Sequence, residues 1–342
     1  MTTATLTIIV PTYNRASSLA LLLHTLRIEL QGIEDKVDLL VSDNASTDET
    51  ADILVEVGAE WPHLQIRRNE LNLGADGNFL ACMETVSTRY GWFISDDDLP
   101  KPGVIRRILN LLKDIQPALV YMQSEWMAPL TSHTQGAQVD TISAEVMDNL
   151  RFAQRVHTWL TFISGIVFDR SALDAALCGD SINRFYGTSL VQLGWVLPLL
   201  RLETASFVVV PEPCMLACKD NTGGYPLLTV FGTRLTQIAQ AVFGPASLLS
   251  RKLIRGNTLY YLPQLIWGAR ISSIGRHQVE NPWPEMGQTL PERTLFWLLL
   301  VPLGRFPRWL ASPVFQLWRI FFRLSRILQH LRRRRQQTIQ FF

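Results

Sequence analysis

Residues 6–122 alternate between strand-like and helix-like segments, and this alternation limits the fold more than any other feature. Runs rich in β-branched and other apolar residues lie at residues 6–10, 37–42, 64–67, 90–94 and 118–122. Between them apolar residues recur every three or four positions, which is the helical period. Such an order is typical of an α/β fold with a mostly parallel central sheet covered by helices.

Polar clusters follow three of these predicted strands, at residues 11–15, 42–48 and 95–98. The carboxyl ends of parallel strands meet at one edge of a sheet, and ligands of α/β proteins bind there. We therefore expect the three clusters to lie close together and to form the functional site.

The third cluster contains three adjacent carboxylates, Asp96, Asp97 and Asp98. Adjacent carboxylates repel one another unless a cation or water compensates them. A hard divalent ion, Mg²⁺ or Mn²⁺, binds carboxylate and diphosphate oxygens together. The run therefore predicts a metal site on a surface loop that contributes little to packing. A solvated acidic loop is the alternative.

Four segments carry a resemblance to a known family: Val10-Pro-Thr-Tyr-Asn-Arg15, Ser42-Asp-Asn-Ala-Ser-Thr-Asp48, Asn72-Leu-Gly-Ala-Asp-Gly-Asn78 and Trp92-Phe-Ile-Ser-Asp-Asp-Asp98. In this order, the chain resembles family 2 glycosyltransferases of the GT-A fold, and most of all the abequosyltransferase branch of O-antigen synthesis. Weaker likeness to the family continues at residues 164–169 and 187–189. The likeness to the abequosyltransferase branch is carried by residues 42–48, 78–81, 187–189 and 220–221. The family usually spaces its acids as Asp-x-Asp-Asp, and Ser95 stands at the first position here.

The resemblance implies a metal-dependent site for a nucleotide-diphosphate-sugar. It gives catalytic roles to Asp97 and Asp98, and it makes Asp98 the leading metal ligand, together with Asp96. The implied nucleotide-sugar-binding residues are Pro11, Thr12, Tyr13, Arg15, Asp43, Asn72, Gly74, Asn78 and Asp96. Asp43 could accept a hydrogen bond from uracil or from cytosine, so it does not fix the base.

More local roles are open for some of these residues. Asp43 could instead be a helix-capping carboxylate, and residues 72–74 could form an ordinary turn. Ser46 and Glu49 have the spacing of a capping box, which predicts the start of the second helix.

We divide the chain into four regions. Residues 1–125 form the nucleotide-sugar-binding half of a GT-A domain, and residues 126–230, with a strand at 162–168, form the acceptor-side half. Residues 231–293 are a helical region followed by a proline-containing linker from residue 276. Residues 294–342 are a basic amphipathic tail.

The second half departs from the family pattern at the expected position of a catalytic base. Inverting members usually carry an acid after the Gly-Thr-Ser segment, but residues 190–194 contain none. Asp180, Glu203 and Glu212 are near in sequence and match no motif. We therefore assign no base and no stereochemical outcome.

The tail has the composition of a helix that lies on a membrane. Its polar residues Gln316, Arg319, Arg323, Arg326 and His330 follow steps of three and four, so they form one stripe on an otherwise apolar helix. Residues 294–342 contain nine Arg and no acid. A basic stripe opposite an apolar face predicts attachment to an anionic membrane surface. A helix packed on the body or on another subunit is the alternative.

The nine-residue apolar run at 295–303 is shorter than the roughly 20 residues that span a bilayer. The first ten residues lack the basic region of a secretory signal. We therefore expect a peripheral protein on the cytoplasmic face of the plasma membrane.

These features together predict a glycosyltransferase whose acceptor is a lipid-linked saccharide, such as a polyprenyl-linked oligosaccharide. Nucleic acid is not an expected partner, because the basic excess is confined to the tail. A nucleotidyltransferase would need a Gly-rich phosphate loop after the first strand, and residues 11–17 contain no Gly. A non-catalytic scaffold on a transferase fold is the other alternative.

Overall fold

The computed structural model describes residues 4–61, 63–128, 130–131, 136–219, 224–271, 281–333 and 338–341, with side chains up to residue 325. The strands are β1 (Leu6–Thr12), β2 (Val37–Asp43), β3 (Leu64–Arg68), β4 (Tyr90–Phe93), β5 (Leu99–Pro100), β6 (Leu119–Met127), β7 (Ile142–Met147), β8 (Ile166–Asp169), β9 (Phe207–Cys218) and β10 (Thr338–Phe341).

The helices are α1 (Ala16–Glu29), α2 (Thr50–Glu60), α3 (Gly74–Met83), α4 (Val104–Ile115), α5 (Asn149–Val156), α6 (Leu173–Leu177), α7 (Leu193–Leu199), α8 (Leu235–Phe243), α9 (Leu248–Gly256), α10 (Leu262–Ile271), α11 (Trp283–Thr289), α12 (Arg293–Leu295), α13 (Val301–Arg305) and α14 (Arg308–Arg333). Shorter helical turns are η1 (Glu34–Lys36), η2 (His157–Thr161), η3 (Ile163–Gly165), η4 (Thr229–Arg234), η5 (Asn257–Tyr261) and η6 (Phe296–Leu300).

The strands form one sheet in the order β10-β7-β9-β6-β8-β4-β1-β2-β3, with β5 paired to β9. Strands β3, β2, β1 and β4 are parallel, as the alternating pattern predicts. The expectation of a mostly parallel sheet fails in the second half, which is mixed: β6 and β9 are parallel, but β8 is antiparallel to β4 and β6, and β7 is antiparallel to β9. Parallel neighbours need long crossovers, and the regular helical crossovers stop after α4.

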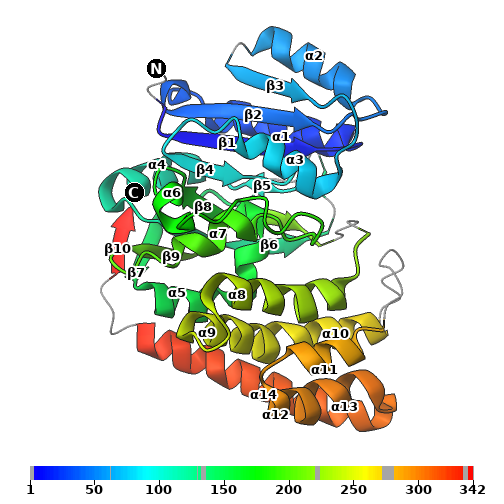
Figure 1. The fold of residues 1–342 in the computed structure, drawn as a ribbon. Helices are drawn as coiled ribbons and strands as arrows, with labels where there is room; N and C mark the ends of the chain where they lie inside the picture. The colour runs from blue at the N-terminus through cyan, green and yellow to red at the C-terminus, as the bar shows by residue number, and fades with distance from the viewer. Residues whose placement is uncertain are drawn as a thin grey trace.

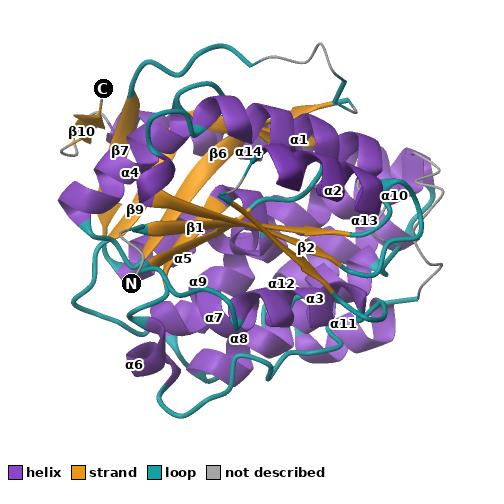
Figure 2. Cartoon of the chain, turned by 90° about the horizontal axis from the view of Figure 1, so that it is seen from above, coloured by secondary structure: helices purple, strands orange, loops and turns teal. Residues whose placement is uncertain are grey.

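Helices cover both faces of the sheet, with α1, α2 and α4 on one side and α3 and α7 on the other (Figure 2). Strand β1 is buried along its whole length because it lies in the middle of the parallel half. Its side chains alternate between two cores, with Ile8 facing α1 and α4 and Ile9 facing the other layer. This continuous apolar run is typical of a parallel strand that is covered on both faces.

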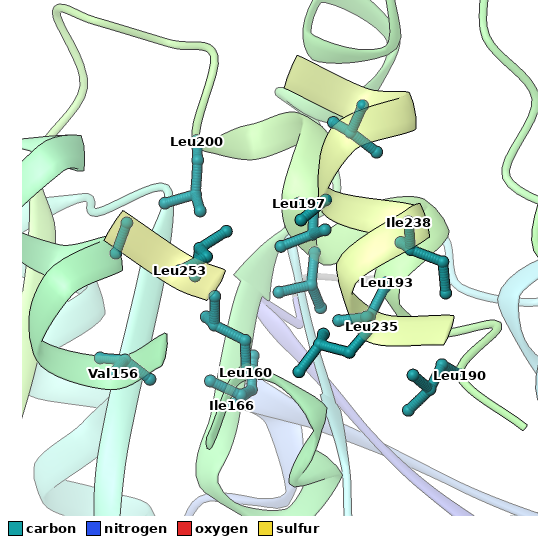
Figure 3. Close-up of a cluster of buried hydrophobic side chains, with 14 of the residues drawn as sticks. Val156, Leu160, Ile166, Leu190, Leu193, Leu197, Leu200, Leu235, Ile238 and Leu253 are labelled. Atoms are coloured by element: carbon teal, nitrogen blue, oxygen red, sulfur yellow. The ribbon is translucent and has the colours of Figure 1, made fainter. Parts of the chain in front are cut away.

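Helices α8 to α14 form a further layer beside the sheet, in the lower part of Figure 1. Leu193 and Leu197 of α7 point toward Leu235 and Ile238 of α8, and Leu253 of α9 joins the same cluster (Figure 3). The predicted helical region after residue 231 is thus confirmed, and it shares a hydrophobic core with the sheet.

Two predicted segments differ from the structure. The strand expected over residues 162–168 begins only at Ile166, because residues 157–165 form the turns η2 and η3. The predicted linker is wrong for residues 283–289, which form α11. Pro282 and Pro284 lie at the start of this helix, where the fixed φ of proline is tolerated, so these prolines begin a helix instead of marking a linker. Residues 276–280 lie outside the described part of the chain.

The capping box predicted from Ser46 and Glu49 does not form. The Ser46 hydroxyl accepts a hydrogen bond from the Asn14 backbone N–H, and Glu49 makes no side-chain cap. Asp48 takes the capping role, because its Oδ1 accepts from the Thr50 N–H at the start of α2. Its Oδ2 accepts from the Ala16 N–H, so one carboxylate ties together the first turns of α1 and α2.

The predicted tail helix is confirmed as α14, and one side of it packs on the body. Trp318 is buried and its Nε1 donates to the Leu259 carbonyl at 2.7 Å. Phe315 stacks on Trp267 with 4.7 Å between ring centroids. Strand β10, beyond α14, pairs with β7 at the edge of the sheet. Among the described residues, no helix has the length and apolarity that a membrane span requires.

A glycine on β4 gives a direct test of the packing between β4 and β8. A Cβ on Gly91 would clash with the Phe168 ring, which lies opposite it in the register. We expect Gly91→Ala to lower the free energy of unfolding by about 1–3 kcal/mol in urea titrations, because the core must shift. Gly268→Ala on α10 is the matched control, since its Cβ would meet open space. Equal stability of the two variants would contradict this packing.

Candidate functional site

The three polar clusters meet at the carboxyl ends of the parallel strands, as predicted. Strands β1 and β2 end in register at Thr12 and Asp43, and the acidic run follows β4, which pairs with β1 on its other side. Thr12 Oγ1 donates to Asp96 Oδ2 at 2.7 Å, which joins the first cluster to the third. Asn14 donates its N–H to Ser46 Oγ at 2.9 Å, which joins the first cluster to the second.

Arg15 compensates two of the three acids. Its guanidinium contacts Asp97 Oδ2 and lies 3.5 Å from Asp96 Oδ1. Burial alone would lower the pKa of Arg15, but the charges of Asp96 and Asp97 outweigh it, so this pKa lies above its usual value. The cation that the acidic run requires is therefore supplied in part by the chain itself.

Asp98 is held by the second half of the chain. Its Oδ2 accepts from Ser164 Oγ at 2.6 Å, and its Oδ1 accepts from the Cys218 N–H at 3.0 Å. The side chain is buried, so the expectation of a surface-loop carboxylate with little packing role is wrong for this residue. Burial raises the pKa of Asp98 to about 7, and burial does the same for Asp96.

Asp97 is the most accessible acid of the run. Its side chain is 18% exposed, compared with 7% for Asp96. Apart from Arg15, its described partner is Ser95, whose hydroxyl donates to Oδ1 at 2.5 Å. Of the three carboxylates, Asp97 therefore has the best access to a ligand from solution.

Asp43 is fully buried at the end of β2. Its Oδ1 accepts from the Ser46 N–H at 2.9 Å, so it stabilises the turn after β2 and does not cap a helix. Its Oδ2 lies 3.1 Å from Arg68 Nη1 in an ion pair, with no well-aligned hydrogen bond from the described residues. This buried oxygen keeps a hydrogen-bonding capacity that the described residues do not use. On the neighbouring strand, Pro11 of β1 is buried, and Tyr13 just after β1 is exposed.

Asn44 organises the loop before α3, and the sequence did not single it out. Its Nδ2 donates to Asn72 Oδ1 at 2.8 Å and to the Gly74 carbonyl at 3.2 Å. Its Oδ1 accepts from Asn69 Nδ2 and from the Leu73 N–H. Gly74 has a φ of +71°, which favours glycine, so residues 72–74 do form a turn. The position of Asn44 directly after Asp43 was the available signal.

Asn78 is committed to protein partners in this structure. Its Oδ1 accepts from Ser42 Oγ at 2.7 Å and from Asn69 Nδ2 at 3.0 Å, and its Nδ2 donates to the Ser42 carbonyl. These contacts tie α3 to the end of β2. A sugar-binding role for Asn78 stays a prediction, and its contacts are those of a residue that positions the loop.

The Gly187–Ser189 segment is tied to α3. Asp76 Oδ2 accepts from the Gly187 N–H at 2.8 Å and from the Ser189 N–H at 3.1 Å. Arg234 donates to the Thr188 carbonyl from the other side. The sequence missed Asp76, although it lies within the 72–78 motif.

The acids considered as bases make other contacts. Asp180 is ion-paired with Arg184 and Arg201, Glu212 accepts from the Ser143 N–H, and Glu203 is exposed. Gln192, within the 190–194 stretch that lacks the expected acid, donates to the Thr161 carbonyl. Lys219 donates its N–H to the Met127 carbonyl, and Asp220 and Asn221 lie outside the described residues.

The acidic run suits a metal whose other ligands come from the substrate. Within the described residues, no group of three or more His, Cys, Asp or Glu side chains is placed to hold an ion by itself. Asp96 and Asp98 are buried against protein donors, whereas Asp97, although it is paired with Arg15 and Ser95, is the most accessible carboxylate. One carboxylate, two diphosphate oxygens and waters would complete the octahedral oxygen set that Mg²⁺ prefers.

Comparisons with known proteins agree with this geometry. Residues 7–165 match the family model of glycosyl transferase family 2. A segment of 111 residues is 37% identical to abequosyltransferase RfbV of Salmonella typhimurium. This segment covers 31% of this chain and 33% of that protein. The matched part is thus about a third of that relative's length.

Solved structures show the same fold over nearly the whole chain. The crystal structure of S. aureus TarS 1–349 in complex with UDP has a TM-score of 0.60 at 17% identity, covering 94% of this chain and 91% of that one. The complex with UDP-GlcNAc has a TM-score of 0.59 at 16% identity, with coverages of 94% and 92%. At these identities the likeness supports a GT-A-like α/β fold and no more.

The contacts of Asp98 predict a measurable role in stability. Asp98→Ala leaves the Ser164 hydroxyl and the Cys218 N–H without their acceptor, which costs about 1–3 kcal/mol per buried group. We expect urea unfolding to show this loss for Asp98→Ala, and a loss below about 1 kcal/mol for the more exposed Asp97→Ala. An unchanged midpoint and slope for Asp98→Ala would contradict the structural role.

Proposed function

We propose that this chain, which carries a glycosyl transferase family 2 domain at residues 7–165, transfers a sugar from a nucleotide-diphosphate-sugar to an acceptor. The observation that carries the proposal is the meeting of Thr12, Asp43 and the acidic run at one edge of the sheet. At that edge, Asp43 has a carboxylate oxygen suited to a hydrogen bond from the nucleotide base. Asp97 has an accessible carboxylate suited to a metal ion that also binds the diphosphate.

The donor is a nucleotide-diphosphate-sugar in this proposal. Two TarS structures of the same fold contain UDP and UDP-GlcNAc, and the partial relative is an abequosyltransferase. In this chain Asp43 Oδ2 would accept from the N3–H of uracil or from the amine of cytosine. Tyr13, exposed just after β1, offers a ring against which a base can stack. Pro11, Asn72, Gly74 and Asn78 shape the surrounding turns.

A divalent cation completes the site in this proposal, with Asp97 as the leading ligand in place of Asp98. When bound, Mg²⁺ or Mn²⁺ neutralises negative charge that grows on the diphosphate as the glycosidic bond breaks. Arg15 holds Asp97 and Asp96 in place and brings a positive charge to the same edge of the sheet. Thr12 orients Asp96, and Asp98 joins the acidic run to β9 and η3.

The acceptor is a lipid-linked saccharide, reached from an anionic membrane surface on the cytoplasmic side. We base this on the apolar ridge of the tail, defined as the exposed apolar side chains of η6 and α14: Trp297, Leu298, Trp309, Leu310, Leu317, Ile320, Phe321 and Leu324. Exposed Arg305, Arg308, Arg319 and Arg323 lie in the same elements or beside them, and residues 294–342 contain no acid.

The ridge and the packed side of α14 are different faces of one helix. Trp318 and Phe315 face the body, whereas Leu317 and Ile320 are 68% and 55% exposed. Large exposed apolar side chains framed by Arg suit the interface of an anionic bilayer. Because α14 also covers the core, substitutions on the ridge test this idea better than removal of the tail.

The donor and metal are tested together by thermal shift. We expect UDP or CDP with Mn²⁺ to stabilise the protein, by about 2.7 kcal/mol at 100 times the Kd, and to do so less without Mn²⁺. Asp97→Ala should remove the Mn²⁺-dependent part, whereas Asp52→Ala, an exposed acid on α2, should keep it. No stabilisation of the wild-type protein by any nucleoside diphosphate would overturn the proposed function.

Membrane attachment is tested by flotation with liposomes. We expect the full chain to float with anionic vesicles and to bind less as salt rises, because the Debye length falls from about 10 Å at 0.1 M to about 3 Å at 1 M. Leu317→Glu with Ile320→Glu should abolish flotation. The matched control is Ile28→Glu with Val55→Glu, two exposed apolar residues on α1 and α2. Equal flotation of both double variants would contradict the role of the ridge.

A further inference from the structure

Three aromatic side chains gather on the second half of the chain, outside the contacts described so far. Trp126 lies near the end of β6, and its ring centroid is 5.7 Å from that of Trp159 and 5.1 Å from that of Phe162. Trp126 is 37% exposed, and its two neighbours are partly buried. We call these three residues the aromatic cluster.

Two of the three residues of the aromatic cluster lie close to the hydrogen-bond partners of Asp98. Trp126 pairs with Ala217 on β9, and the next residue, Cys218, donates to Asp98 Oδ1. Phe162 stands two residues before Ser164, which donates to Asp98 Oδ2. One partner of Asp98 thus lies on the strand paired with that of Trp126 and the other closely follows Phe162 in the chain, whereas Thr12 and Arg15 contact the acidic run from the β1 side.

The aromatic cluster packs against the helical layer, which limits the movement of its rings. Trp159 makes an edge-to-face contact with Tyr261 at 5.8 Å, and Tyr261 packs on Phe231 at 5.0 Å. Trp159 also packs against the core that α7, α8 and α9 share. A ring supported in this way loses little conformational freedom when a ligand stacks on it, so the exposed part of Trp126 is a preorganised surface.

We propose that Trp126, supported by Trp159 and Phe162, is a stacking surface for a sugar ring of the acceptor. The face of an aromatic ring is electron-rich, and it attracts the C–H groups that line one face of a pyranose. A saccharide is the occupant that suits a single exposed indole beside a glycosyl-transfer site, because its hydroxyls stay in water while its C–H face is covered. This inference rests on the proposed function and adds the location of the acceptor.

The rival occupant is the base of the donor nucleotide, which also stacks on aromatic rings. The geometry favours the saccharide, because Asp43 and Tyr13 lie at the ends of β2 and β1, and β4 and β8 separate these strands from β6 in the sheet. A base held at Asp43 would stack near Tyr13 and not at Trp126.

The test uses two replacements of one side chain. Trp126→Leu keeps an apolar residue and removes the aromatic face, whereas Trp126→Phe keeps a smaller aromatic face. Binding of free methyl mannoside, methyl galactoside and methyl rhamnoside is followed by saturation-transfer NMR in the presence of UDP and Mn²⁺. We expect the C–H signals of at least one glycoside to respond with the wild-type protein. The affinity for that glycoside should be about tenfold weaker for Trp126→Leu, and the loss of affinity should be smaller for Trp126→Phe. Melting temperatures confirm that each variant is folded, and Phe162→Leu is the second variant if Trp126→Leu is not.

The outcomes separate the two proposals. If the wild-type protein binds the nucleoside diphosphate but none of the glycosides, or if the leucine variants bind them equally well, the saccharide surface is wrong and the proposed function stands. If Trp126→Leu weakens the binding of UDP and leaves glycoside binding unchanged, Trp126 stacks on the nucleotide base and not on a saccharide. If no nucleoside diphosphate binds at all, the proposed function fails first.

Discussion

The site depends on the compensation of three adjacent carboxylates. Asp96, Asp97 and Asp98 would repel one another at the end of a buried strand, and the groups that compensate them come from both halves of the chain. β1 and the turn after it supply Thr12 and Arg15, while η3 and β9 supply Ser164 and the Cys218 N–H. The acidic run is therefore the point at which the two halves of the domain are joined.

This arrangement gives the three acids different roles. The outer two are buried against protein donors, and the middle one is left as the most accessible carboxylate. The sequence alone favoured Asp98 as the metal ligand, because a motif shows residue types and spacing but not which carboxylates are buried. The partners of Asp98 lie 66 and 120 residues away in the chain, and no local pattern reports such contacts.

The parallel half of the fold could be predicted because its strands and helices follow their own periods. The second half could not, since it lacks the regular strand–helix alternation and mixes both directions: β8 is antiparallel to β4 and β7 to β9, whereas β6 and β9 are parallel.

Local chemistry was also ambiguous. Ser46 and Glu49 have capping-box spacing, yet Asp48 makes the cap because it also reaches the Ala16 N–H. The helix α14 was predictable from its stripe, but the face that packs on the body was not.

The most direct test of the account is a crystal structure of this chain soaked with UDP and Mn²⁺, measured at the manganese absorption edge. The account predicts one anomalous peak between the Asp97 carboxylate and the diphosphate, with the nucleotide base at Asp43. A peak bound to Asp98 with Asp97 turned away, or no peak at the acidic run while the nucleotide is present, would contradict it.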